Sequence, residues 1–417
     1  LNAKQVKASS GILAKINGGD YALSIKNALV AELTELNANV KVTEIAVNDS
    51  SKNISLGLTR LNTSQEKVKS ITQTGTPSVL TLTEDQLSSF EGTLNKITNN
   101  YSLSVTNVRT ESMSRVAENS RVAAIGIVDT CAQIASHLDE MSDLGVRLVS
   151  AKTTDKEALS LTAEQLKTDG WVLGKIYNGY EISVRSANLV DAASLSKNGK
   201  VKLIDVEDTA ANVIKNIDLL GKLGSNLNSI TLTDSSSDVS ISAAKFAQHA
   251  KVIDKITNPT VSFAVEDVAY AKAASVLGNS KVSQIGLSDT ADVISKNFES
   301  IKLMDSRLSK ITRLGSGTSL ALTAANYEAS ADVFAKFRNS YSVALSDATV
   351  DKAIALAATA QVASVAVVDS SENMSANWNA LNGLGVKLTQ LRQVDSADAF
   401  SITASQMNQS ASLLKKV

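Results

Sequence analysis

The sequence contains very few cysteines, prolines, histidines and aromatic residues, and each shortage argues against particular classes of protein. Cys131 is the only cysteine, so no disulfide can form within the chain and the disulfide framework of a small secreted domain is excluded. Prolines occur only at Pro77 and Pro259, so no proline-rich linker divides the chain. Aromatic residues make up 4% and hydrophobic residues 43%, which indicates a folded chain with an aliphatic core.

Charge of one sign is also lacking. Lys and Arg number 41 against 42 Asp and Glu, so the formal net charge is −1 and no strong field attracts nucleic acid or an anionic membrane. No apolar run approaches the ~20 residues of a membrane span. The first residues do not show the order of a signal peptide, so we expect any export signal to lie outside this sequence.

What the sequence does contain is an internal period of about 80 residues, which decides the fold prediction. A motif of the form apolar-Thr-Ala-x-Gln recurs along the chain. It begins at Leu1, Leu82, Leu161, Ile241, Leu322 and Ile402. The differences between successive positions are 81, 79, 80, 81 and 80. The sequence therefore predicts five tandem repeats and the start of a sixth.

Two further landmarks keep the same spacing. One is a lysine next to an apolar residue, at Lys15, Lys96, Lys175, Lys255, Lys336 and Lys416. The other is an aspartate followed by Ser or Thr, at Asp49, Asp129, Asp208, Asp289 and Asp369. We place the repeats at residues 1–81, 82–160, 161–240, 241–321 and 322–401, with 402–417 as the start of a truncated sixth. Repeat arrays usually carry atypical caps, so we expect the sequence to be a piece of a longer array.

The second repeat illustrates the secondary structure that we predict. The apolar residues Leu87, Phe90, Leu94 and Ile97 lie at helical spacing, and Thr83 is placed to cap that helix. Residues 101–105 alternate as a half-buried strand, and a short second helix follows. Residues 122–128 are apolar almost throughout, as in a strand covered on both faces. A third helix then ends at Gly145, and a last strand begins after it.

Each repeat thus reads strand, helix, strand, helix, strand, helix, strand, turn. Strands that alternate with helices at 20–25 residues indicate parallel pairing through crossover helices. The predicted fold class is α/β, a repeat solenoid of ~80-residue units with a parallel sheet and flanking helices. We expect each repeat to have the neighbouring repeats of the same chain as its partners. A string of separate 80-residue domains is the alternative.

The repeated acidic residues suggest two candidate cation sites. The five Asp-Ser/Thr pairs could form a carboxylate ladder for calcium, but they stand where a strand passes into a helix, and capping explains them without a ligand. The turn before each motif holds Asp234-Ser235-Ser236-Ser237-Asp238 in one repeat and Asp395 and Asp398 in another. The fourth repeat has Gly315-Ser316-Gly317 there, without an acid, so we assign no metal ligand and no cofactor and leave weak calcium binding as the alternative.

Lysine and tyrosine recur as well. The lysines could make a basic stripe for an anionic polymer, although their place at a helix end explains them by the helix dipole. A tyrosine follows each lysine at Tyr21, Tyr101, Tyr180 and Tyr341, with Thr260 in the fourth repeat. Exposed rings would stack sugars, whereas a ring at the start of an alternating strand is expected to be partly buried with its hydroxyl at the surface.

Catalytic residues are not repeated. His137 is expected in a third helix and His249 in a first helix, and no Cys-His, Ser-His-Asp or phosphate-loop pattern appears. Cys131 follows Asp129-Thr130, where a helix terminus would lower its pKa. Its counterparts are Ser51, Ala210, Ala291 and Ser371, which favours a small packing residue. We therefore predict no catalytic residue and no enzyme.

The motifs LTAEQL, IGLSDTADVI and LIDVEDTAANVI, together with Lys-Ile before a tyrosine, resemble the tandem repeats of very large bacterial surface and secreted proteins. Surface-layer subunits and type I-secreted adhesins are of this kind. No glycine-rich calcium nonapeptide occurs here, and the strongly acidic charge of such proteins is missing. The resemblance implies an extracellular or cell-surface location and a non-catalytic role as stalk, surface layer or adhesive segment. Self-association, or a polysaccharide-binding module with a surface glycan as partner, is the alternative that we retain.

Overall fold

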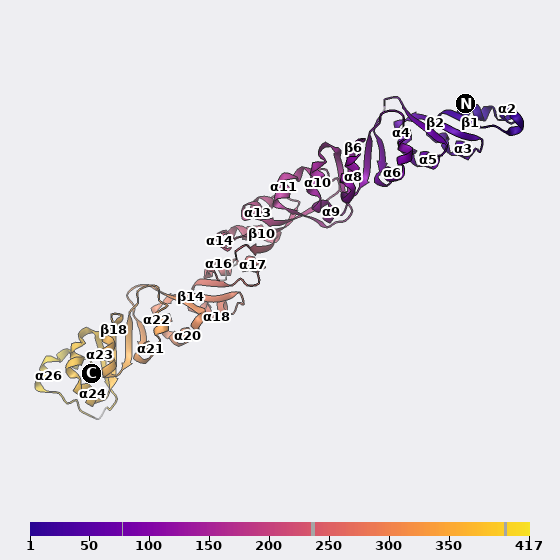
Figure 1. The fold of residues 1–417 in the computed structure, drawn as a ribbon. Helices are drawn as coiled ribbons and strands as arrows, with labels where there is room; N and C mark the ends of the chain where they lie inside the picture. The colour runs from indigo at the N-terminus through magenta and orange to yellow at the C-terminus, as the bar shows by residue number, and fades with distance from the viewer. Residues whose placement is uncertain (77, 235–237, 396–397) are drawn as a thin grey trace. The chain divides into compact units, whose positions relative to one another are not determined.

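The computed structural model describes residues 1–76, 78–234, 238–395 and 398–417. Contacts divide the chain into two compact units, one of 1–206 and 223–229 and the other of 207–222 and 230–417. Figure 1 shows strands and helices alternating along both units.

All strand pairs in the described residues are parallel, and strand order follows chain order in every sheet. The first unit contains a sheet of β1 (Leu23–Ala28), β2 (Val42–Ser50) and β3 (Val68–Thr74), and a second of β4 (Leu80–Thr83), β5 (Leu103–Val108), β6 (Val122–Asp129) and β7 (Leu148–Thr153). The third sheet consists of β8 (Ala158–Thr162), β9 (Glu181–Ala187), β10 (Val201–Asp208) and β11 (Leu227–Leu232). The second unit contains β12 (Val239–Ser242), β13 (Phe263–Val268), β14 (Val282–Thr290) and β15 (Leu308–Leu314), then β16 (Leu320–Thr323), β17 (Val343–Ala348), β18 (Val362–Asp369) and β19 (Leu388–Gln393). The predicted α/β class with parallel strands and flanking helices is confirmed.

The first helical segment of each repeat, and of the partial sixth, consists of two short helices. These pairs are α1 (Ala3–Ala8) and α2 (Ser10–Leu13), α6 (Glu84–Ser89) and α7 (Glu91–Leu94), α11 (Ala163–Thr168) and α12 (Gly170–Leu173), α16 (Ala243–Gln248) and α17 (Ala250–Ile253), α21 (Ala324–Glu328) and α22 (Ala331–Phe334), and α26 (Ala404–Gln409) and α27 (Ala411–Leu414). We predicted one continuous helix that is capped by Thr83 and reaches Ile97, and its continuity is wrong. Phe90 has φ −109° and ψ 16°, which bends the chain, and Ile97 lies beyond the helix.

The second helical segment of each repeat is a single helix, and a 3-10 turn opens it in the first two repeats. It comprises η2 (Val30–Glu32) with α3 (Leu33–Ala38), η3 (Thr110–Ser112) with α8 (Met113–Glu118), α13 (Leu189–Leu195), α18 (Tyr270–Leu277) and α23 (Val350–Ala357).

The helix before the last strand is again divided. Its pairs are α4 (Ser51–Leu56) and α5 (Leu58–Thr63), α9 (Cys131–Ser136) and α10 (Leu138–Asp143), α14 (Ala210–Lys215) and α15 (Ile217–Leu223), α19 (Ala291–Lys296) and α20 (Phe298–Lys302), and α24 (Ser371–Ala376) and α25 (Trp378–Gly383). The remaining 3-10 turns are η1 (Ile16–Gly19), η4 (Gly145–Arg147), η5 (Gly224–Asn226), η6 (Asp305–Arg307) and η7 (Gly385–Lys387). Gly145 has φ +54°, so the predicted glycine end of α10 is confirmed.

Burial alternates along the strands. In β5 the apolar Leu103, Val105 and Val108 are buried, while Ser104 is half-buried. We expected residues 122–128 to be covered on both faces, but in β6 Ala123 is exposed and Ala124 and Val128 are only half-buried. Val122 and Ile125–Ile127 are buried, so this strand is covered on both faces only over its middle part.

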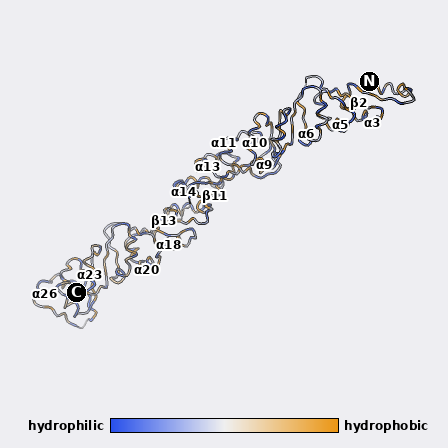
Figure 2. The backbone as a smooth tube through the Cα atoms, in the orientation of Figure 1, coloured by the Kyte–Doolittle hydropathy of each residue, from blue (hydrophilic) through white to orange (hydrophobic). Residues whose placement is uncertain are grey.

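Hydrophobic and hydrophilic positions interleave along the whole chain, as Figure 2 shows. Within the described residues, no helix has the length and apolar character needed to cross a membrane.

Candidate functional site

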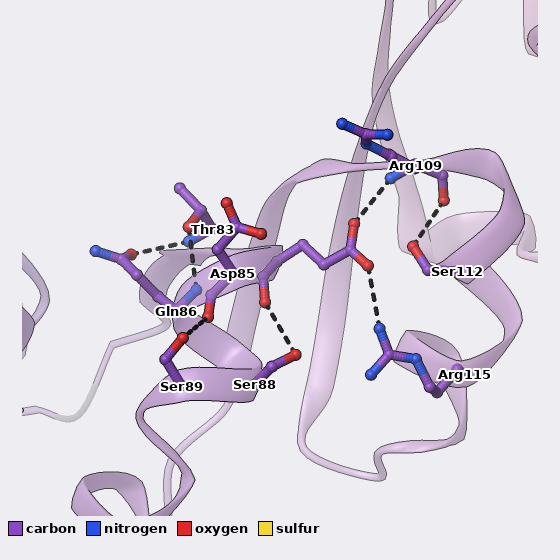
Figure 3. A network of polar contacts seen from close by, with 9 residues as sticks. Thr83, Asp85, Gln86, Ser88, Ser89, Arg109, Ser112 and Arg115 are labelled. Atoms are coloured by element: carbon purple, nitrogen blue, oxygen red, sulfur yellow. Dashed lines mark hydrogen bonds and ion pairs between the residues drawn. The ribbon is translucent and has the colours of Figure 1, made fainter.

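The repeated Thr-Ala-x-Gln motif forms the start of the first helix. In the second sheet the Oγ1 of Thr83 accepts the backbone N–H of Gln86 at 3.2 Å, and the Gln86 side chain accepts the Thr83 N–H at 2.9 Å (Figure 3). This reciprocal capping box satisfies two helix donors. The same box forms at Asn2, Thr162 and Thr403, so the predicted cap is confirmed and the repeated glutamine is explained.

An acidic residue next to this cap joins the first helix to the second. The Glu84 carboxylate accepts the backbone N–H of Arg109 at 3.0 Å and the Arg115 guanidinium at 3.2 Å (Figure 3). In other repeats Lys167 pairs with Asp191, and Lys352 pairs with Glu328. These exposed ion pairs hold helices within one repeat and contribute little individually.

The aspartates of the Asp-Ser/Thr pairs connect two strand ends. One oxygen of Asp369 accepts the Val350 N–H at 2.9 Å, and the other accepts the N–H of Ser370 and the Asn373 side chain, both at 2.8 Å. Asp49, Asp129 and Asp289 make the corresponding bonds to Val30, Thr110 and Tyr270. The helix cap itself is the following residue, as in Ser50, Thr130, Thr209, Thr290 and Ser370. These carboxylates therefore bind backbone N–H groups.

The aspartates in the turns before the repeated motif bind the N-terminal ends of the same helices. The carboxylates of Asp155, Asp234 and Asp395 accept the first N–H of α9, α14 and α24 at 2.7–3.2 Å. Asp238 instead accepts hydrogen bonds from the hydroxyls of Ser283 and Ser262, and these bonds hold the pKa of its carboxyl below the usual value. The residues Ser235–Ser237 of the predicted loop lie outside the described residues, as do 396–397 between Asp395 and Asp398. Within the described ranges, no three His, Cys, Asp or Glu side chains are grouped to hold a metal ion.

The repeated lysines lie where one sheet meets the next repeat. The Lys96 carbonyl accepts the Ile71 N–H of β3 at 2.8 Å, and its ammonium donates to the Gln65 carbonyl. The carbonyls of Lys175, Lys255, Lys336 and Lys416 accept the corresponding N–H groups of β7, β11, β15 and β19. Our helix-dipole explanation is incomplete, because the Lys96, Lys336 and Lys416 ammonium groups bond to carbonyls after the last helix of the preceding repeat.

An asparagine three residues after each of four lysines completes this contact, and the sequence analysis missed it. The Asn99 side-chain oxygen accepts the Gln73 N–H at 3.1 Å, and its amide donates to the Gln73 carbonyl at 3.1 Å. Asn178, Asn258 and Asn339 bind both backbone groups of Thr153, Leu232 and Arg313 in the same way. We call these four side chains the asparagine clasps. Their regular spacing was readable as a fourth landmark.

A second repeated position that we did not predict lies near the end of the strand that follows the first helix pair. Asn27, Asn107, Ser186, Asp267 and Asp347 all have φ between +51° and +58°. Short polar residues tolerate this left-handed conformation better than branched ones. The register of each strand pair shifts there, which turns the chain toward the next helix.

The tyrosines are half-buried, as predicted, but they precede their strands. A cation from the same repeat covers the ring in three of them. The Lys41 ammonium lies 5.4 Å from the Tyr21 ring centre, the Arg121 guanidinium 4.6 Å from that of Tyr101, and the Lys200 ammonium 3.9 Å from that of Tyr180. Tyr341 instead packs against Phe334 and Phe337. Burial raises the pKa of Tyr101, Tyr180 and Tyr341. One ring face is thus already occupied.

The thiol of Cys131 is buried in the first turn of α9. Burial, followed by the hydrogen bond and charge of Asp155, raises the pKa of this thiol to about 12. The helix end therefore does not activate it, and the packing interpretation is the better one.

The two histidines lie at helix breaks in different repeats. The His137 Nδ1 is 2.9 Å from the Gln133 carbonyl of its own helix turn. The His249 Nε2 is 2.7 Å from the Asp218 carboxylate on the neighbouring α15. The first contact lies within the last turn of α9, and the second joins two helices.

Comparison of the chain with protein-family models, curated proteins and solved structures found no match.

Proposed function

We propose that this chain is a non-catalytic structural segment of a very large bacterial cell-surface or secreted protein. In this proposal the repeats stack continuously as an α/β solenoid and serve as a stalk, a surface layer or an adhesive surface. The observation that carries it is the contact between consecutive repeats: the lysine carbonyl and the asparagine clasp, found at four junctions.

The clasp favours stacking over separate domains because it completes a sheet edge. An edge strand presents unpaired N–H and C=O groups that pair readily with other chains. At the first junction, Ile71 bonds to Lys96 and Thr98, and Gln73 bonds to the Asn99 amide, which resembles a peptide group. The next repeat thus supplies a rudimentary parallel strand, which also forms the isolated bridge Ile71–Ile97.

The first strand of a repeat is covered from the other side. The Ser55 hydroxyl of α4 accepts the Thr81 N–H of β4 at 3.1 Å, and Ser295 of α19 does the same for Ala321 of β16 at 2.9 Å. These bonds join the last helix pair of one sheet to the first strand of the next sheet. They support a continuous array in which each repeat satisfies backbone groups of its neighbour.

A structural role is also supported by what the repeated polar residues do. The repeated aspartates, lysines and asparagines bond to backbone groups, and three of the four tyrosine rings face cations of their own repeat. A polysaccharide platform is less well supported, because Lys41, Arg121 and Lys200 already occupy a face of the ring that sugars would need. The cell-surface location rests on the resemblance of the repeats.

The stacking is tested by replacing one clasp. Asn99→Ala removes both side-chain bonds to Gln73 and is expected to cost about 1–2 kcal/mol in urea unfolding. Hydrogen exchange of the Gln73 amide should become faster. Asn100→Ala, at the exposed neighbouring position, is the matched control and should change neither quantity. Equal behaviour of the two variants would contradict the proposal that the clasp holds the junction.

The location is tested separately. Antibodies against this chain should label intact, unpermeabilised cells of the organism that makes it, or its culture medium. Signal confined to permeabilised cells would contradict an extracellular role while leaving the stacking untouched.

A further inference from the structure

The first repeat exposes apolar residues at positions that are buried in the later repeats. Ile12 in α2 is 70% exposed, whereas its counterparts by spacing are buried. Those counterparts are Thr93, Val172, Val252, Val333 and Leu413. Because the same position is covered five times, its exposure marks a face that lacks its partner.

Two neighbouring positions behave in the same way. Leu1 is 46% exposed, while Leu82, Leu161, Ile241 and Leu322 are buried at the corresponding place. Ile16 is 44% exposed, whereas its counterparts Ile176 and Ile256 are buried and Ile97 and Phe337 are half-buried. Scattered exposed aliphatic residues are ordinary on a protein surface, but three that share one repeated docking position are not scattered.

The later repeats show what covers this face. Thr93 of α7 donates to the Asn62 side chain of α5 at 2.9 Å, so the last helix pair of the preceding repeat lies over it. Ile97 forms its bridge with Ile71 of β3 in the same preceding repeat. At the far end, Leu413 of α27 is buried beside α25, where the Trp378 Nε1 donates to the Ser410 hydroxyl at 3.0 Å.

We propose that Leu1, Ile12 and Ile16 form a docking face for one further α/β repeat of this kind, which presents its last helix pair and the open edge of its last strand. This inference rests on the stacking proposed above. Lys15 stands at the position of Lys96, whose carbonyl accepts the N–H of Ile71. Gly18 stands where later repeats have the clasp asparagine, so this junction would lack the side-chain bonds.

The test extends the intact chain by one repeat. A second copy of residues 322–401 is fused directly before Leu1, so that Ser401 precedes Leu1 as it precedes Ile402. Ile12→Cys is introduced into both the original and the extended chain, and maleimide labelling is measured. The native Cys131 is buried and serves as an internal check that the protein is folded.

Labelling of residue 12 should be fast in the original chain and slower by on the order of 100-fold in the extended chain, because reaction would then require local opening of the junction. Val172→Cys, at the corresponding buried position, is the matched control and should be protected in both chains. If residue 172 is protected and residue 12 stays reactive in the extended chain, the docking face is refuted and the stacking stands. If residue 172 is itself reactive while Cys131 is protected, the stacking fails.

A second copy of the chain is the competing occupant. Protection of residue 12 in the original chain that increases with protein concentration would identify self-association and overturn the proposal.

Discussion

The Asp369 carboxylate shows how one residue can fix two chain segments. It accepts N–H groups from Val350 and Ser370 and from the Asn373 side chain. Partial burial raises its pKa, but these hydrogen bonds outweigh that effect and hold the pKa below the usual value. Four other aspartates stand at the corresponding positions, so the same local arrangement of a carboxylate recurs in every repeat.

This arrangement predicts a pH-dependent contribution to stability. Because the pKa of Asp369 is lower in the folded chain than in the unfolded one (~3.9), its stabilisation is fully present above that value and is lost as the pH falls through the lowered folded value. Asp369→Asn should cost about 1 kcal/mol in urea unfolding at pH 6, and the difference from the original chain should shrink toward pH 3. A difference independent of pH would show that the charge of Asp369 contributes nothing.

Cys131 provides the opposite case, a group kept neutral. Its thiol pKa of about 12 and its burial predict negligible maleimide labelling of the folded chain at pH 8, with full labelling in urea. Cys131→Ser should be tolerated, since Ser371 at the same place donates to Asp395 at 2.9 Å. Labelling of the folded chain at the rate of a free thiol would contradict the buried assignment.

At the scale of elements, the sequence was most informative where a local pattern decides the structure. The strands, the Thr83 cap and the end of α10 at Gly145 follow from spacing and capping chemistry within a few residues. The break at Phe90 could not be read in this way, because nothing in its residue type opposes a helix. The Asn99 clasp was missed for another reason: its partner Gln73 lies 26 residues upstream, outside any local pattern.

The break between the two helices of each first pair lies at the contact with the preceding repeat. Two serines at such breaks, Ser330 and Ser410, can be compared directly. Ser330 is fully buried, and its hydroxyl has no hydrogen-bond partner among the residues that the structure describes. Ser410 is equally buried but accepts the Trp378 Nε1. Removal of an unpaired buried hydroxyl is neutral or favourable, whereas removal of an acceptor leaves a buried donor unpaired.

Ser330→Ala is therefore expected to leave stability unchanged or to raise it by up to ~1 kcal/mol, and Ser410→Ala to lower it by about 1–2 kcal/mol. Urea unfolding of the two variants measures both effects. Loss of stability of similar size in both would mean that Ser330 has a partner after all.

For the molecule as a whole, these junctions indicate that the repeats are not interchangeable. The position of Trp378 is held by Leu58, Leu138, Ile217 and Phe298 in the earlier repeats, and that of Ser410 by Phe90, Asp169, His249 and Ser330. The large Trp378 and Phe298 thus correspond to the serines Ser410 and Ser330 in the next repeat. The smaller Leu58 and Ile217 correspond to the larger Phe90 and His249. Close packing requires such compensation of volume.

Deletion of single repeats tests this matching. Removal of residues 322–401 brings Phe298 opposite Ser410 and keeps an aromatic residue facing serine. Removal of residues 241–321 brings Ile217 opposite Ser330 and leaves a small residue facing a medium one, with a cavity between them. Both shortened chains should fold, since the strand order and the lysine contact are retained, but the second should be less stable by about 1–2 kcal/mol in urea unfolding. Equal stability, or the reverse order, would show that the junctions adapt to any neighbour and that the order of the repeats carries no packing information.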